Sequence, residues 1–311
     1  MALELCSQRK SKKENTALSL VNDTIVRFVR KLRFYYLTLL TVGTILVVWE
    51  VTAHVLRFFT PYATIILPPL EHIITVSLPG FATFYGVGMP GIYGQAPSFS
   101  FAFLVLGYHS IITFFRVITG TLLGAGIGIG LGILIGWSYR LETFVSIPLL
   151  FIRTVPLLAI IPLFIVWFGG SELGVLLYIA FGSFIILVIN TIEAIRNVPP
   201  VYQNYARTLG ATRGQLFRTV IIPAIVPELT GGIRVVIGLS WAIGLAAEYL
   251  ATQRGLGRMM ILSEQYLYTG RMIMIAFLYM IFSIGLNKVY VQGANYITRW
   301  VPRVEKIREG R

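Results

Sequence analysis

Six long apolar runs, separated by short polar segments, set the pattern of this chain. An α-helix needs about 20 consecutive apolar residues to cross the hydrocarbon core of a bilayer. Each run is close to that length, so the pattern predicts an all-α protein with about six transmembrane helices. The predicted spans are Tyr35–Leu56, Ile112–Trp137, Phe144–Phe168, Val175–Ile192, Gly232–Leu250 and Met272–Val291.

Prolines and glycines mark the interruptions. The segment Leu70–Leu78 reads as a short amphipathic helix, and Phe81–Phe103, rich in glycine and aromatic residues, reads as an outer loop at the membrane interface. Pro148, Pro156 and Pro162 interrupt the third span. Membrane helices tolerate proline where neighbours or water satisfy the freed carbonyl groups, so this span is expected to be broken.

Small residues recur every four positions in the second span, at Gly120, Gly124, Gly128 and Gly132. This spacing places them on one face of a helix, where the missing side chains let a second helix approach closely. The pattern predicts tight helix packing and gives no information on a transported molecule.

One polar segment, residues 193–228, stands out between the spans. Within it, Gln203–Pro223 predicts a short helix, a turn at Gly210 and a second short helix that leads back to the bilayer. A polar hairpin gains nothing from lipid, so we expect a partner in the aqueous phase to bind it. A second loop, Ala251–Arg271, contains the sequence Gly-Leu-Gly at 255–257 and is expected on the outer side.

Composition and charge agree with a membrane protein and orient it. The chain has 311 residues, 56% of them hydrophobic, a mean hydropathy of +0.77 and a net charge of +13. With six spans, both termini and the loops around Arg140 and Gly210 share one side, which holds 19 Lys and Arg residues against four on the other. The positive-inside rule places that side in the cytoplasm. A second crossing within residues 98–137 would invert this distribution, and no nucleic acid is needed to explain the basic charge.

Motifs for chemistry are missing from the sequence. It has no GxxxxGK[ST] phosphate loop, no HExxH and a single cysteine, Cys6. From these absences we predict that the chain is not an enzyme and that it holds no metal site and no cofactor. Uphill transport would draw its energy from an ion gradient or from a separate ATPase.

The polar hairpin resembles the coupling segment of type I, binding-protein-dependent permeases of ATP-binding-cassette (ABC) importers. Their signature is Glu-Ala-Ala-x-x-x-Gly, followed by a segment that ends in Ile-x-Leu-Pro. Asn204, Tyr205 and Ala206 occupy the first three positions here, Gly210 follows, and Val220–Pro223 closes the motif. The spacing is kept, while Asn204 replaces the acidic residue.

The resemblance extends from Leu67 to the last span, toward the branch that imports nitrate, sulfonates and taurine. Similar elements are Leu67-Pro68-Pro69, Arg116 with Gly120, Arg153 with Pro156, Ala247-Glu248 and Gly255–Gly257. The resemblance implies a permease fold in a bacterial inner membrane. It also implies a cytoplasmic ATPase that carries ATP and Mg²⁺, a second permease copy forming a homodimer, and an extracytoplasmic substrate-binding protein.

The resemblance also implies roles for residues. The expected ATPase-coupling residues are Asn204, Ala206, Arg207, Leu209, Gly210, Arg213, Leu216, Phe217, Arg218 and Pro223. The expected translocation pathway is lined by Arg153, Pro156, Asn190, Trp241 and Glu248, with Arg153 suited to an anionic substrate. Two alternatives stay open: the hairpin arginines contact anionic lipid headgroups, and Arg153 only snorkels to the inner interface.

The predicted organisation has four parts: a basic cytoplasmic tail at 1–34, a first span with an aromatic outer loop at 35–109, a permease core at 110–291, and a basic cytoplasmic tail at 292–311. An ATP-driven importer of a small polar or anionic solute is the leading interpretation. An ion-coupled secondary transporter and a membrane scaffold are the alternatives. Nitrate, bicarbonate, an organosulfonate and a vitamin precursor all fit the pattern.

Overall fold

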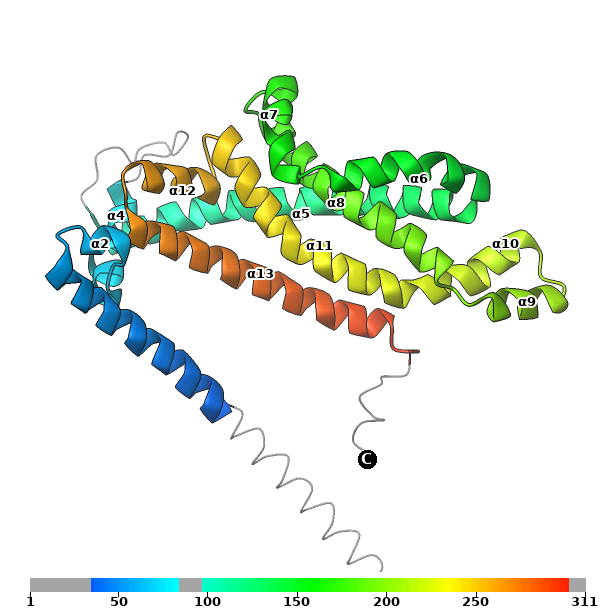
Figure 1. Cartoon of the computed structure of the whole chain (residues 1–311), viewed down its shortest axis with the longest axis horizontal. Coiled ribbons are helices and arrows are strands. Elements are labelled where there is room, and N and C mark those ends of the chain that lie inside the picture. The colour runs from blue at the N-terminus through cyan, green and yellow to red at the C-terminus, as the bar shows by residue number, and fades with distance from the viewer. Residues whose placement is uncertain (1–34, 84–96, 302–311) are drawn as a thin grey trace, which may run out of the picture. The chain divides into compact units, whose positions relative to one another are not determined.

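The structure, a computed structural model, describes residues 35–83 and 97–301. The described residues are helical and contain no β-strand (Figure 1). They divide into two units, residues 1–70 and residues 71–311, which are described separately below. The predicted tails at 1–34 and 302–311 and most of the aromatic loop, residues 84–96, lie outside the described residues.

The first unit is built on one apolar helix, Tyr35–Phe59, whose side chains are mostly exposed. The short helix α2, Ala63–Ile66, follows it. Trp49 Nε1 donates to the Pro68 carbonyl at 3.0 Å, and Glu50 Oε2 accepts from the Leu70 N–H at 2.8 Å. These bonds hold the returning segment against the helix. Glu50 and His54 lie one helical turn apart on the same face, as a spacing of four residues predicts, with 3.5 Å between Glu50 Oε1 and His54 Nδ1.

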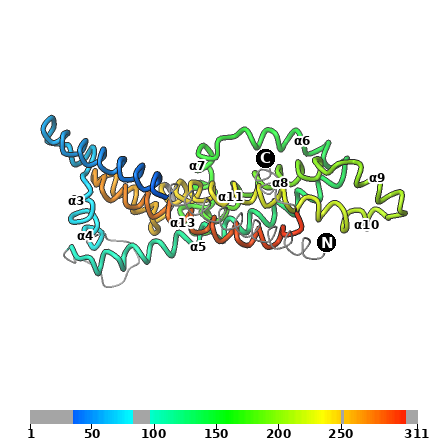
Figure 2. The backbone as a smooth tube through the Cα atoms, turned by 90° about the horizontal axis from the view of Figure 1, so that it is seen from below, coloured from blue at the N-terminus to red at the C-terminus, as the bar shows by residue number. Residues whose placement is uncertain are grey.

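Four long helices form the frame of the second unit: α5 (Phe99–Trp137), α8 (Glu172–Arg196), α11 (Ile222–Ala251) and α13 (Thr269–Ile297). They run side by side, with α9 and α10 at one end and α4 and α12 at the other (Figures 1 and 2). Their shared core includes Val117, Ile179, Trp241 and Ile275. Long apolar helices pair their backbone N–H and C=O groups within the helix, which the interior of a bilayer requires.

The shorter helices complete this unit. It begins within α3 (Leu70–His72), which continues as a π-helical turn, Ile73–Ser77, then α4 (Leu78–Gly80) and a 3₁₀ turn, Phe81–Thr83. Its remaining helices are α6 (Tyr139–Thr154), α7 (Leu157–Phe168), α9 (Pro200–Thr208), α10 (Arg213–Leu216) and α12 (Leu256–Gln265). Counting both units, the described residues contain five helices that are long and apolar enough to cross a membrane, Tyr35–Phe59 among them, or six if α6 and α7 count as one span.

The third predicted span is broken by its middle proline. Helices α6 and α7 meet at a bend of 96°. Proline disfavours a helical conformation in the residue before it, and Val155 is extended, with φ −73° and ψ 124°. Pro156 is the N-cap of α7, while Pro148 and Pro162 lie inside their helices.

Two predicted loops contain a helix. Helix α5 begins at Phe99, inside the predicted loop Phe81–Phe103, and continues past residue 110, the predicted start of the permease core. Helix α12 lies in the predicted outer loop Ala251–Arg271. Residues 98–137 hold a single helix from Phe99 onward, which agrees with the charge distribution and leaves no room for an extra crossing.

Glycines allow α5 and α8 to touch. A Cβ on Gly120 would come within 2.7 Å of Ile179 Cβ, and one on Gly132 within 2.5 Å of Thr191 Cβ. On Gly128 it would lie 2.9 Å from the Phe184 carbonyl oxygen, and on Gly124 it would collide with the Ala180 carbonyl oxygen. Each turn of this stripe therefore faces the α8 backbone directly.

Candidate functional site

The polar hairpin of residues 197–216 projects beyond the long helices (Figure 1). Helix α9 begins at Pro200, a favourable first position because proline lacks the N–H that a helix start leaves unpaired. Gly210 then turns the chain with φ +84°, a conformation that L side chains rarely adopt. Thr212 caps α10 in a reciprocal pair of hydrogen bonds with Gln215. This helix, turn and second helix are what the sequence pattern predicts.

Two contacts fix the base of the hairpin. Asn197 Nδ2 donates to Glu228 Oε1 at 2.7 Å, joining the end of α8 to the start of α11. Below it, Ile195, Val198, Ile221 and Ile225 form a separate buried cluster. The hairpin is thus attached to two long helices at once, while its tip stays free of other elements.

The tip of the hairpin exposes apolar and basic side chains. Val201, Tyr202, Tyr205 and Leu209 are all more than half exposed, and their spacing places them on one side of α9. Arg207, Arg213 and Arg218 are exposed and form no ion pair with another residue that the structure describes. Large exposed apolar side chains rimmed by charge are typical of a protein interface.

Two of the expected coupling residues face the wrong way for contact with a partner. Leu216 is only 1% exposed, and the Phe217 ring packs on Trp137 with 4.9 Å between the ring centroids. They anchor the hairpin to its own chain. Sequence reasoning missed Val201, Tyr202 and Tyr205, although aromatic side chains three and four residues apart on a polar helix were the available signal.

A buried ion network occupies the opposite end of the unit. The Arg116 guanidinium donates to Glu248 Oε1 at 2.7 Å, to Glu172 Oε1 at 2.5 Å and to the Arg254 carbonyl at 2.7 Å. Glu248 is fully buried. Because ionised side chains inside a membrane protein need partners, this triad explains why Arg116 and Glu248 are tolerated within apolar helices.

The Gly-Leu-Gly segment closes over this network. Gly257 N–H donates to Glu248 Oε2 at 2.9 Å, and Leu256 N–H donates to Thr113 Oγ1 at 2.8 Å. A Cβ on Gly255 would lie 2.5 Å from Glu248 Oε2, and its φ of +107° also requires glycine. The network therefore ties α12 to α5, α8 and α11.

The five predicted pathway residues fall into two groups. Glu248 belongs to the network, and Trp241 is 3% exposed, stacked on Phe282 with 5.8 Å between ring centroids. The described residues enclose both side chains. Arg153, Pro156 and Asn190 lie together elsewhere, around the bend between α6 and α7.

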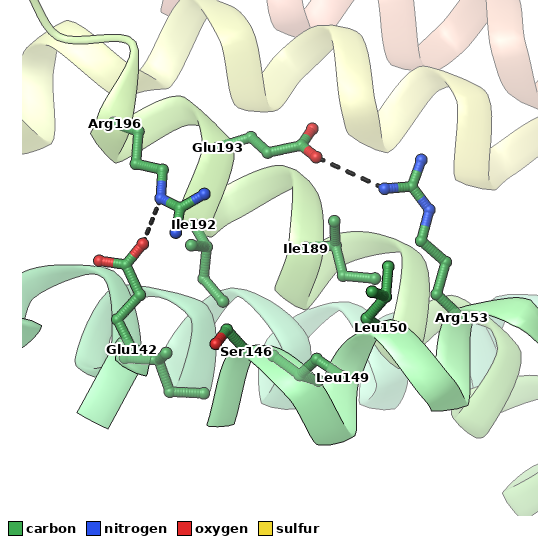
Figure 3. A pocket seen from close by; sticks show the side chains of 10 residues that line it. Glu142, Ser146, Leu149, Leu150, Arg153, Ile189, Ile192, Glu193 and Arg196 are labelled. Carbon is green, nitrogen blue, oxygen red and sulfur yellow. Dashed lines mark hydrogen bonds and ion pairs between the residues drawn. The ribbon is translucent and has the colours of Figure 1, made fainter. Parts of the chain in front are cut away.

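A cavity of about 160 Å³ lies between α6 and α8, next to an end of α5 (Figure 3). Its floor is apolar, with Leu149, Ile189 and Ile192. Two ion pairs cross it: Arg153 with Glu193, at 3.6 Å between Nη1 and Oε1, and Arg196 with Glu142 in direct contact. Charged groups within the span region face water or protein rather than lipid, so this face of α6 and α8 is expected to line an interior surface.

A second cavity, of about 200 Å³, lies at the bend itself. Arg153 and Ile189 line this cavity as well as the first. Asn190 is the other polar residue on the lining, and the walls include Val155, Leu157 and Ile186.

Comparisons with known proteins agree with these features. The family described as "Binding-protein-dependent transport system inner membrane component" matches residues 128–300. A putative aliphatic sulfonates transport permease protein, SsuC of Bacillus subtilis, is 39% identical over 52% of this chain and 59% of its own length. The taurine transport system permease protein TauC of Escherichia coli is 30% identical over 74% of this chain and 76% of its own length.

Among solved structures, an inward-facing form of the MetNI methionine ABC transporter aligns with a TM-score of 0.52 at 19% identity. The alignment covers 66% of this chain and all of that chain, which supports the fold. The resemblance to the sulfonate and taurine branch is confirmed by the two relatives. The chain therefore belongs to the family of binding-protein-dependent transport system inner membrane components and is a permease subunit of an ABC importer.

Proposed function

We propose that this chain is the membrane-spanning half of an ATP-driven importer of a small anion, and that the α9–α10 hairpin docks on a separate ATPase subunit. The observation that carries the proposal is the projecting hairpin with its exposed Tyr202, Tyr205 and Leu209 and its exposed arginines, which form no ion pair with a described residue. Membership of the family implies an ATPase and a substrate-binding protein as partners. ATP and Mg²⁺ would be held by the ATPase, with no cofactor on this chain.

The attachment of the hairpin suits force transmission. Residues Arg213–Tyr249 form one long helical stretch, from the hairpin turn to Glu248 in the ion network. A displacement of the hairpin would move α11 at one end and, through the Asn197–Glu228 bond, α8 as well. Because α5 packs on α8 through glycines, the three helices would move together against the remaining parts of the assembly.

The substrate class follows from chemistry shared by the relatives. The names of SsuC and TauC give aliphatic sulfonates and taurine as their cargo, and both carry a sulfonate group. In this chain Arg153 lies on the charged interior face beside the bend. A cation there supports an anionic substrate.

A second copy of this chain would complete the pathway. The α6–α7 segment exposes Phe144, Phe151, Leu158 and Trp167 beside its charged groups. A homodimer would place the two charged faces opposite each other, shielded from lipid. With both termini in the cytoplasm, the hairpin would face the ATPase and α12 the outer binding protein. The ion-coupled secondary carrier is not favoured, because its class differs from that of the family.

Substitution of the turn glycine tests the docking. Proline fixes φ near −65°, which is incompatible with the φ of +84° at position 210. Gly210→Pro is therefore expected to abolish co-purification of the ATPase, while the permease still inserts. Gly214→Ala is the matched control, because nothing lies within 4 Å of its Cβ position. An intact Gly210→Pro complex would contradict the assignment.

A further inference from the structure

We propose that Arg153 has two alternative anionic partners: the Glu193 carboxylate, which it holds in this structure, and the transported oxyanion, which binds in the cavity at the α6–α7 bend. The inference rests on the proposed function and adds the site and the switch of partner. Three observations support it: the lining of the cavity, the loose ion pair and the position of Glu193.

The cavity at the bend is lined by few polar groups, which are a guanidinium and an amide. Of its lining side chains, only those of Arg153 and Asn190 are polar, and isoleucines dominate the walls. The Asn190 amide makes no hydrogen bond to another residue that the structure describes. It fits against Gly232, where a Cβ would lie 2.8 Å from Asn190 Nδ2. A largely apolar cavity with one guanidinium, and one amide that no described residue hydrogen-bonds, is complementary to a small aliphatic oxyanion.

The bend adds a third source of positive potential. Leu157, the first residue of α7, lines the same cavity. The first N–H groups of a helix lack intrahelical partners, and the helix dipole favours an anion there. The three groups together can serve the oxygens of a sulfonate, while the isoleucine walls accept its carbon chain.

The Arg153–Glu193 pair is loose by comparison with its neighbour. Its closest atoms are 3.6 Å apart, beyond hydrogen-bond distance, and both side chains are at least half exposed. Arg196 and Glu142, which line the other cavity, the one between α6 and α8, are in direct contact, and the Glu142 side chain is 15% exposed (Figure 3). Exposed ion pairs contribute little, whereas an oxyanion that accepts two parallel N–H bonds from arginine binds more strongly. The incoming anion can therefore replace Glu193.

The position of Glu193 gives the exchange a consequence. Glu193 lies in the last turn of α8, directly before the segment that leads into α9. When the substrate takes Arg153, this carboxylate is released at the root of the coupling hairpin. In the empty state the same carboxylate neutralises Arg153, so anions that cannot fill the apolar walls compete poorly.

Arginine-specific labelling tests the inference on the full complex in nanodiscs. Phenylglyoxal modification of Arg153 and Arg196 is followed by mass spectrometry, with methanesulfonate as the probe and sodium chloride at equal ionic strength as the reference. We expect methanesulfonate to slow modification of Arg153 severalfold and leave Arg196 unchanged. Asn190→Leu should weaken this protection. Glu193→Gln should strengthen it and speed the unprotected reaction of Arg153, whereas Glu142→Gln should affect Arg196 alone.

The outcomes separate the two proposals. If methanesulfonate does not protect Arg153 in a complex that, reconstituted into closed vesicles, imports a sulfonate with ATP, the inference is overturned and the proposed function stands. Equal protection of Arg153 and Arg196 would indicate ionic screening and also overturn it. A complex that imports no anion with ATP would overturn the proposed function itself.

Discussion

At the scale of single residues, the buried charges explain why this chain tolerates ionisable groups inside apolar helices. Glu248 has no exposed surface and accepts hydrogen bonds from Arg116, Thr113 and the Gly257 N–H. An arginine with two carboxylates leaves one negative charge, and backbone and hydroxyl donors surround the inner carboxylate. The group thereby fixes the C-terminal end of α11 in place.

Removal of one partner should therefore be costly. Loss of one member of a buried ion pair destabilises a protein by about 3–5 kcal/mol, because the other charge stays buried. We expect Glu248→Ala to lower the free energy of unfolding of the purified complex by an amount in that range. Glu172→Ala should cost clearly less, since the Glu172 side chain is 62% exposed. Equal loss of stability in the two variants would show that burial does not set the cost.

The exposed tyrosines of α9 lead to a second prediction at this scale. Tyr205 is 69% exposed, so its removal should leave the fold intact. Aromatic anchors at the centre of an interface contribute about 2 kcal/mol or more each. Tyr205→Ala should weaken ATPase binding about tenfold or more in a titration with the purified ATPase. Tyr139→Ala, also highly exposed, serves as the control, and equal affinities of the two variants would contradict docking through α9.

At the scale of elements, contact between α5 and α8 depends on which glycines face the partner helix. Gly124 points at Ala180 and Ser183, whereas nothing lies within 4 Å of a Cβ on Gly126, two residues away. The same residue type therefore has different value on two faces of one helix. The two glycines therefore allow a matched test of the packing between α5 and α8.

Alanine substitutions at these two glycines provide that test. Gly124→Ala forces atoms into the α8 backbone, and overpacking of this kind costs about 1–3 kcal/mol. We expect a lower melting temperature and a smaller monodisperse fraction in detergent. Gly126→Ala should be neutral or slightly stabilising, since alanine favours helix more than glycine does. A stable Gly124→Ala permease would contradict the observed packing.

The elements also show which features of the fold can be predicted from the sequence. Apolar run length predicts the spans well, because a bilayer accepts little else, and Gly210 predicts the hairpin turn because few residues adopt its conformation. Helix α12 was missed because it is short and its position depends on hydrogen bonds to His109 and Thr113, which are far away in sequence. The inward packing of Leu216 and Phe217 was missed for the same reason: periodicity says which side chains share a face, and tertiary contacts decide what that face meets.

At the scale of the whole molecule, residues 71–311 have two functional ends. The α9–α10 hairpin lies at one, and α12 with the ion network lies at the other (Figures 1 and 2). The proposed coupling requires these ends to face opposite sides of the membrane. The excess of Lys and Arg predicts that the hairpin end faces the cytoplasm.

Cysteine labelling checks this orientation. Cys6 is the only cysteine in the sequence and can be replaced by serine. Single cysteines at the exposed positions Thr208 and Gln253 are then tested with a membrane-impermeant maleimide. Thr208→Cys should react only in inside-out vesicles, and Gln253→Cys only in right-side-out vesicles. Reaction of both from one side would refute a membrane-crossing path between the two ends.

The most direct test of the account is uptake by reconstituted vesicles. The complex of this chain, its ATPase and its binding protein is expected to concentrate a sulfonate only when ATP is enclosed with the ATPase. Vesicles that hold this chain alone should take up nothing under a proton or sodium gradient. Gradient-driven accumulation by the isolated chain would contradict the claim that ATP hydrolysis on a partner drives this permease.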